Sequence, residues 1–144
     1  MINGLINHAA VAAALASPDG WRGSFEGRPT FFERQLFEER GYKVTLHRFV
    51  AADAPDCFHS HPATAIRMVL SGGYEEELFG GGTQVCAPGF VGIVDPNMTH
   101  RVHRLLNGSE SVSLWVRLPV TDKIQLIGSG WHRTPAKPLL KDPR

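Results

Sequence analysis

Cysteine is scarce in this chain, and no export signal is recognisable. The 144 residues include only two cysteines, Cys57 and Cys86, too few for the disulfide framework that stabilises small secreted domains. Residues 9–16 are apolar and end in Ala-Leu-Ala, but no basic segment precedes them, which favours a short helix over a signal peptide. We therefore expect a reduced, cytoplasmic protein.

The chain also lacks an excess of charge of either sign and any long hydrophobic run. Lysine and arginine number 15 against 14 acidic residues, for a net charge of +1, and the arginines are dispersed rather than gathered in a basic stripe. No apolar run reaches the roughly 20 residues that span a bilayer. We expect no nucleic-acid or membrane partner, and a small molecule as the ligand.

Glycine and proline, in contrast, are frequent. The 15 glycines and 10 prolines lie between short apolar runs, a pattern typical of an all-β chain with many turns. The length suits one compact domain. We divide the chain into a helical lead and loop (residues 1–28), a β-barrel domain (29–133) and a flexible C-terminal tail (134–144).

Alternating apolar and polar residues predict the strands. Residues 20–27 are expected to form a loop, and residues 30–38 fit both a strand and one or two helical turns. Hairpin turns are expected at residues 71–73 and 107–108. The expected strands comprise one that begins near Cys57 and those over residues 43–50, 66–70, 74–79, 91–94, 99–105 and 111–118.

Two histidines, His59 and His61, form the most informative motif of the sequence. Residues at i and i+2 of a strand point to the same face, so both imidazoles can reach one metal ion. His100 comes from a separate segment, after a turn at Asp95 and Pro96. Three imidazoles suit Zn, Cu, Fe or Ni and leave coordination positions open for water, substrate or dioxygen. The sequence thus predicts a divalent metal bound by His59, His61 and His100.

Both histidine segments resemble signatures of the cupin family. In residues 57–73, a His-X-His pair is followed by an apolar run and glycines; in residues 87–104, Pro-Gly, an apolar run and a proline precede His100. The resemblance implies a cupin-type double-stranded β-helix, a jelly roll of about eight strands. Cupins are often dimers, so a homodimer is also expected, with residues 31–37 as an edge strand or dimer contact.

One position departs from the cupin pattern. Ala65 stands where most cupins carry a glutamate ligand, which leaves a three-histidine site. In this the chain resembles the thiol dioxygenases, whose ferrous iron is held by three histidines, and small cupin-like proteins that read His-X-His-Pro and end in Gly-Gly-Tyr. The resemblance implies Fe(II), although Zn, Mn, Ni and Cu accept the same donors.

Strand parity nominates Arg67 as a second inward-facing residue. If Ala65 faces inward, so does Arg67, and a buried guanidinium needs a counter-charge. That partner is either a substrate carboxylate, which the planar fork of Arg67 would clamp, or the side chain of Glu76. The sequence leaves both roles open.

Further candidates follow from the neighbouring strands. Tyr74, Glu76 and His103 are candidates for proton transfer, and Trp115 and Arg117, with Arg67, for contact with substrate. His47 is interpreted as structural or superficial.

The leading functional prediction is a small cupin metalloenzyme, an Fe(II)-dependent dioxygenase that acts on a small anionic or chelating substrate. Two alternatives stay open because one scaffold hosts many activities. The first is a non-redox isomerase, lyase or dehydratase in which the metal is a Lewis acid or acid–base residues suffice. The second is a small-molecule binding or sensor module.

Overall fold

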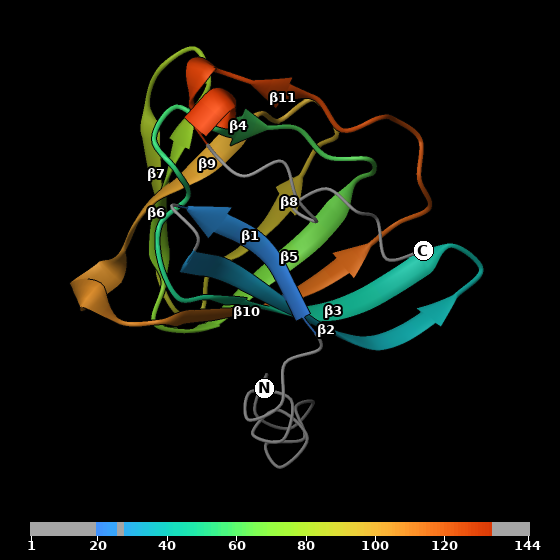
Figure 1. Cartoon of the computed structure of the whole chain (residues 1–144). Helices are drawn as coiled ribbons and strands as arrows, with labels where there is room; N and C mark the ends of the chain where they lie inside the picture. The colour runs from blue at the N-terminus through green and yellow to red at the C-terminus, as the bar shows by residue number, and fades with distance from the viewer. Residues whose placement is uncertain (1–19, 26–27, 134–144) are drawn as a thin grey trace.

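Two antiparallel sheets face each other in the computed structural model, which describes residues 20–25 and 28–133 (Figure 1). The first sheet has the strand order β1 (Gly20–Phe25), β2 (Arg28–Glu39), β3 (Tyr42–Phe49), β10 (Ser111–Arg117), β5 (Ala65–Ser71) and β8 (Val91–Val94). The second has the order β11 (Leu126–Ile127), β4 (Phe58–His59), β9 (His100–Leu105), β6 (Tyr74–Leu78) and β7 (Thr83–Cys86). Two short 3-10 helices complete the described part, η1 (Leu106–Gly108) and η2 (Ser129–Arg133).

This architecture confirms the predicted all-β, double-stranded β-helix fold. The expected loop over residues 20–27 is wrong in part, because Gly20–Phe25 pair with β2 as a strand. The ambiguous residues 30–38 are strand, since β2 gains backbone partners on both sides, in β1 and in β3. The predicted N-terminal helix and the tail over residues 134–144 lie outside the described residues.

Neither predicted hairpin forms, because β5 and β6 lie in different sheets, and so do β9 and β10. The turn that joins β5 to β6 depends on a glycine. Gly72 has a φ of +73°, and a Cβ at this position would lie 1.9 Å from the carbonyl oxygen of Glu110. A left-handed backbone and such a close approach are both open to glycine alone. The turn carries the chain from the first sheet to the second, so that Arg67 of β5 and Glu76 of β6 face each other from different sheets.

The inner face of the first sheet divides into an apolar and a polar end. At the apolar end a core cluster joins both sheets through Phe49, Val69, Tyr74, Cys86 and Val102. At the other end the register sets Lys43 opposite Arg117, Thr45 opposite Trp115 and His47 opposite Ser113. Directly opposed residues of an antiparallel pair share a face, so this end offers polar side chains to the interior.

No helix within residues 20–25 and 28–133 is long and apolar enough to cross a bilayer.

Candidate metal centre

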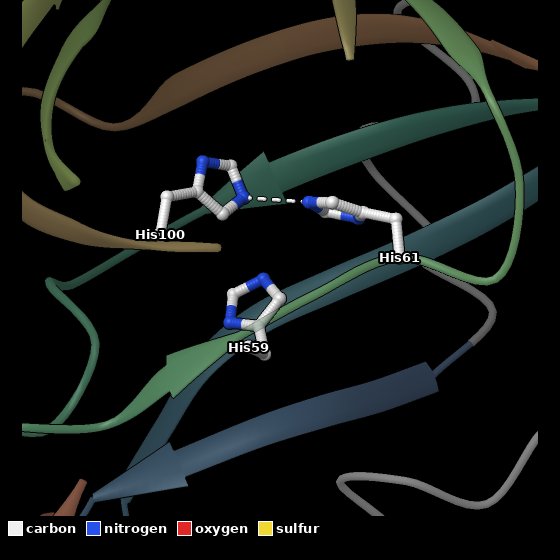
Figure 2. Close-up of side chains that lie close together, drawn as sticks. All are labelled: His59, His61 and His100. Carbon is white, nitrogen blue, oxygen red and sulfur yellow. Dashed lines mark hydrogen bonds between the residues drawn. The ribbon is translucent and has the colours of Figure 1, made fainter. Parts of the chain in front are cut away.

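Three histidines from two strands and a loop meet inside the fold. His59 ends β4 and pairs with His100, the first residue of β9, while His61 follows in the loop beyond β4. One ligand nitrogen from each of the three lies within 4.8 Å of the others. Figure 2 shows the rings turned toward one another, with Nε2 of His61 and Nε2 of His100 2.9 Å apart.

The structural reason for this convergence differs from the one predicted. Strand parity was expected to align His59 with His61, but β4 ends at His59. The His61 backbone N–H instead donates to the carbonyl of Pro96 over 3.4 Å, which holds the loop against the segment that leads to His100. A loop contact, rather than a continuous strand, thus brings His61 to the site.

The imidazoles of His59 and His61 are neutral in the folded protein. Burial, with the nearby His100, lowers the pKa of His59 to about 3 despite the opposing effect of Glu76. Burial, and then the repulsion that a protonated His100 or His59 would exert, lower the pKa of His61 well below its ordinary value. A neutral imidazole has a free nitrogen lone pair at neutral pH, which is the form that binds a metal.

The carboxylate of Glu76 orients the ring of His100. His100 Nδ1 lies 2.6 Å from Glu76 Oε2, and a carboxylate can only accept, so the proton of the imidazole sits on Nδ1. The lone pair is then on Nε2, which faces His61. Carboxylate partners of this kind fix the tautomer and the ring orientation of metal-binding histidines.

Glu76 is itself held by Arg67. The guanidinium donates to both carboxylate oxygens, over 2.6 Å and 2.7 Å, and both side chains are fully buried. Burial alone would raise the pKa of Glu76, but hydrogen bonds from Arg67 and His100 lower it to about 2. Of the two roles considered for Arg67, the structure shows the internal pair, and neither partner lines the cavity described next.

The histidines open onto a cavity of about 220 Å³ between the sheets. Aromatic rings form much of its wall, and polar side chains of β2, β3 and β10 face it across from the histidines. Besides the histidines of the site, the cavity lining includes Phe31, Glu33, Lys43, His47, Asp53, Ala65, Tyr74, Trp115 and Arg117.

The remaining predicted residues divide between this cavity and the outside. Tyr74, Trp115 and Arg117 line the cavity. Tyr74 accepts a hydrogen bond from Arg67 over 3.0 Å, and burial raises its pKa, so the phenol is protonated. His103 is not brought to the site, because it contacts Arg101 and Glu75 on the outer face of β6 and β9.

His47 is a cavity residue that the sequence interpretation missed. It stacks on Trp115, with ring centroids 4.6 Å apart, and Trp115 in turn lies 5.7 Å from the ring of His61. The signal was present in the sequence, since Lys43 and His47 alternate in phase with the apolar Phe49. Polar residues in phase with an apolar one on a strand indicate a polar part of the interior.

The donor set fits a divalent metal held by imidazole alone. Ala65 is buried against Val94 and Trp115, so the position where most cupins carry a glutamate offers no oxygen. Glu76 already binds His100 and Arg67. His59, His61 and His100 form the one group of three or more metal-ligating side chains found in the described part of the chain.

Comparisons with known proteins point to the same fold. No protein-family model and no curated protein matches the chain. Among solved structures, a protein from Ralstonia eutropha proposed to be a mannose-6-phosphate isomerase is 26% identical, with a TM-score of 0.58 over 68% of this chain and 92% of that one. A Klebsiella pneumoniae protein with a double-stranded β-helix domain is 19% identical, with a TM-score of 0.55 over 76% and 91%.

An iron protein is also similar in fold. The Fe(II) form of HppE is 10% identical, with a TM-score of 0.59 over 72% of this chain and 57% of that one. At such low identity the likeness concerns the fold, whereas the histidines are observed in this chain itself. The chain has the double-stranded β-helix fold of the cupins, and a group of three histidines lies inside that fold.

Proposed function

We propose that this protein is an Fe(II)-dependent dioxygenase that acts on a small anionic, chelating molecule. The observation that carries the proposal is the convergence of three histidine ligand nitrogens, within 4.8 Å of one another, on the wall of a cavity. Three neutral ligands leave a divalent ion with its full charge, which favours an anionic substrate at the ion. The similar fold of Fe(II) HppE supports iron as the metal.

Each side chain of the site has a separate task in this proposal. His59, His61 and His100 would hold the ion, and Glu76 would keep the Nε2 lone pair of His100 directed at it. Fe(II), when bound, would supply a chelation site for substrate and the reduction of dioxygen. Trp115 and the other aromatic walls would exclude water from the bound substrate.

Metal analysis followed by oxygen uptake tests the proposal. Protein purified without air should contain close to one iron per chain or take up one Fe(II), and it should then consume dioxygen with a subset of small carboxylates, thiols and diols. The His61→Ala variant serves as the control, because it should lose both metal and uptake. A wild-type protein that binds iron yet consumes no dioxygen with any chelating candidate would contradict the oxygenase.

A non-redox isomerase, lyase or dehydratase is the second candidate. Its support is the 26% identical neighbour, which is proposed to be an isomerase, together with the protonated Tyr74 on the cavity wall. Such an enzyme would turn over without air and would exchange substrate hydrogen with solvent. The same set of candidate substrates, incubated in deuterated water under argon, separates it from an oxygenase. A binding module would show neither reaction.

A cytoplasmic homodimer is part of the proposal. Leu36 and Phe37 of β2 are exposed, at 46% and 52%, which supports this segment as a contact between two copies. Sedimentation analysis of wild type and of a Phe37→Ser variant tests it, and a monomeric wild-type protein would contradict it.

A further inference from the structure

The wall of the cavity carries five aromatic rings that contact one another in sequence, here called the aromatic arc. The ring centroid of Tyr74 lies 5.4 Å from that of Phe49, and Phe49 stacks on Phe31 at 4.9 Å. Phe31 meets His47 edge to face at 4.8 Å, and His47 stacks on Trp115 at 4.6 Å. All five rings line the cavity, so their surfaces are available to a molecule inside it.

The aromatic arc ends at the metal centre. The ring centroid of Trp115 lies 5.7 Å from that of His61, with the two planes inclined by 36°. His61 is one of the three histidines whose ligand nitrogens converge. A group attached directly to a metal-bound head therefore lies next to Trp115, without a long spacer between the metal and the arc.

The polar atoms of three cavity rings are engaged within the protein. The hydroxyl of Tyr74 accepts a hydrogen bond from Arg67 over 3.0 Å, and His47 Nε2 lies 3.5 Å from Glu33 Oε2. Trp131, which also lines the cavity, donates its Nε1–H to two backbone carbonyls over 2.9 Å and 3.1 Å. These side chains consequently offer a ligand mainly the apolar surfaces of their rings.

The charged side chains on the cavity wall balance one another. Glu33 and Asp53 are acidic, Lys43 and Arg117 are basic, and their formal charges sum to zero. Lys43 Nζ lies 3.2 Å from Glu33 Oε1, so this pair is already neutralised inside the wall. The wall therefore has no surplus charge for a second ionic group, and the part of a substrate beyond the metal should be uncharged.

The size of the cavity limits the molecule to one ring. Its volume is about 220 Å³, whereas an apolar cavity of about 150 Å³ takes up benzene. The difference accommodates a short head with metal-binding atoms. Apolar ring surface in contact with water is unfavourable, and a flat ring would displace that water. Stacking and edge contacts with the arc favour an aromatic ring over a saturated one.

We propose that the substrate is a single-ring aromatic chelator, in which an otherwise uncharged flat ring carries two adjacent donor atoms for the metal and packs against the aromatic arc. This inference rests on the proposed metal-dependent function, because the head binds to the ion. It adds the substrate class. It also assigns a role to Phe31, which lies in the middle of the arc and selects aromatic rings over saturated ones.

Hydroxamates that differ only in the attached group test the substrate class. Hydroxamates chelate divalent metals, and the visible absorption of Co(II)-loaded protein reports their binding without any turnover. The probes are acetohydroxamate, which carries a methyl group, benzohydroxamate, which carries an aromatic ring, and cyclohexanecarbohydroxamate, whose saturated ring is of similar size. Dividing each affinity by that of the same hydroxamate for free Co(II) removes differences in intrinsic chelation.

The wild-type protein should prefer the aromatic probe over both others. It should bind benzohydroxamate at least about tenfold more tightly than acetohydroxamate, because the ring buries apolar surface. It should bind benzohydroxamate about fivefold more tightly than the cyclohexane compound, because only the flat ring makes aromatic contacts with the arc.

Phe31→Leu and its neighbour Phe32→Leu form a matched pair of variants. Phe32 has the opposite strand parity, and the guanidinium of Arg48 lies 5.5 Å from its ring centroid, so this ring is turned away from the cavity. Phe31→Leu should reduce the preference for the aromatic over the saturated ring to below about twofold, with little change for acetohydroxamate. Phe32→Leu should keep the wild-type preference. A purely structural Phe31 predicts instead a loss of stability with an unchanged preference.

Equal binding of the aromatic and the saturated probe by the wild-type protein would overturn the substrate class. This comparison needs no variant, so it decides even where Phe31→Leu does not fold. A preference that survives in folded Phe31→Leu would overturn the role of Phe31. Failure of the proposed function looks different: bound iron without oxygen uptake would leave the preference intact, whereas wild type that binds neither Co(II) nor acetohydroxamate would overturn both proposals.

Discussion

His100 Nδ1 lies 2.6 Å from Glu76 Oε2, and this contact joins a candidate metal ligand to the buried ion pair of the barrel. The guanidinium of Arg67 donates hydrogen bonds to both oxygens of the same carboxylate. The guanidinium fixes the carboxylate, the carboxylate fixes the tautomer of the imidazole, and the imidazole presents Nε2 toward His61. The site is therefore supported by a charged network that is closed to solvent.

Replacing His61 with alanine should remove most bound metal. In this variant only His59 and His100 remain to hold the ion. The loop that carries residue 61 offers no substitute donor. Metal content after dialysis against a weak chelator is the measurement, with His103→Ala as the matched control because His103 lies on the outer face of the sheet. Equal metal content in His61→Ala and wild type would show that the assigned ligand is wrong.

Replacing Glu76 with glutamine should weaken metal binding by about 10–100-fold, the usual effect of losing the carboxylate behind a ligating histidine. It should also lower the free energy of unfolding by about 3–5 kcal/mol, because it leaves Arg67 as an uncompensated buried charge. Urea denaturation and metal titration measure the two effects separately.

The double variant Arg67→Met with Glu76→Gln distinguishes these effects. It removes both charges of the pair, so much of the lost stability should return, while metal affinity should stay low because His100 still lacks its carboxylate. If metal affinity recovers together with stability, the role of Glu76 in orienting His100 is contradicted.

The metal-free protein should lose stability in two stages as the pH falls. The histidine stage comes first: burial lowers the pKa of His59 to about 3 and that of His61 well below its ordinary value of 6.5. Below pH 6.5 the unfolded chain binds protons that the folded chain does not, so acid favours unfolding. The His59→Gln and His61→Gln variants should each show a smaller loss of stability than wild type between pH 6.5 and 5.

The second stage belongs to Glu76. Its pKa is lowered from an ordinary value of 4.5 to about 2 in the folded protein, so its stabilising contribution is complete above pH 4.5 and is lost as the pH falls from there toward 2. Thermal unfolding of the metal-free protein from pH 7 to pH 3 measures both stages. A melting temperature that does not change from pH 7 to pH 5 would contradict the histidine stage.

Introducing glutamate at Ala65 should tighten metal binding and impair turnover. Ala65 is buried beside Trp115 and Val94, where a carboxylate could become a fourth ligand at the position that substrate needs. Metal titration and oxygen uptake are the measurements, and Ala65→Gln controls for size. Unchanged turnover with a carboxylate bound to the metal would count against direct chelation of substrate.

The sequence by itself determined the fold class and the residues that meet at the site. Short alternating runs between glycines and prolines are compatible with little other than antiparallel strands, and His59, His61 and His100 stand out because the segments that carry them resemble the two cupin signatures. The alternation of side chains along β5 also predicted correctly that Arg67 faces the interior of the fold. The fold class and the inward position of Arg67 are local properties, since each depends on the period of a strand.

Tertiary structure alone decided the partners of these residues. Whether Arg67 meets Glu76 or a substrate depends on how β5 and β6, which lie in different sheets, face each other beyond the turn at Gly72. His47 and Lys43 joined the cavity wall because β3 pairs with β10, a strand more than 60 residues away along the chain. The phase of Lys43 and His47 along β3 indicates that both face the interior. Their cross-strand neighbours leave no periodic trace in a single sequence, so only the assembly of the sheets decided that they share a cavity with the histidines.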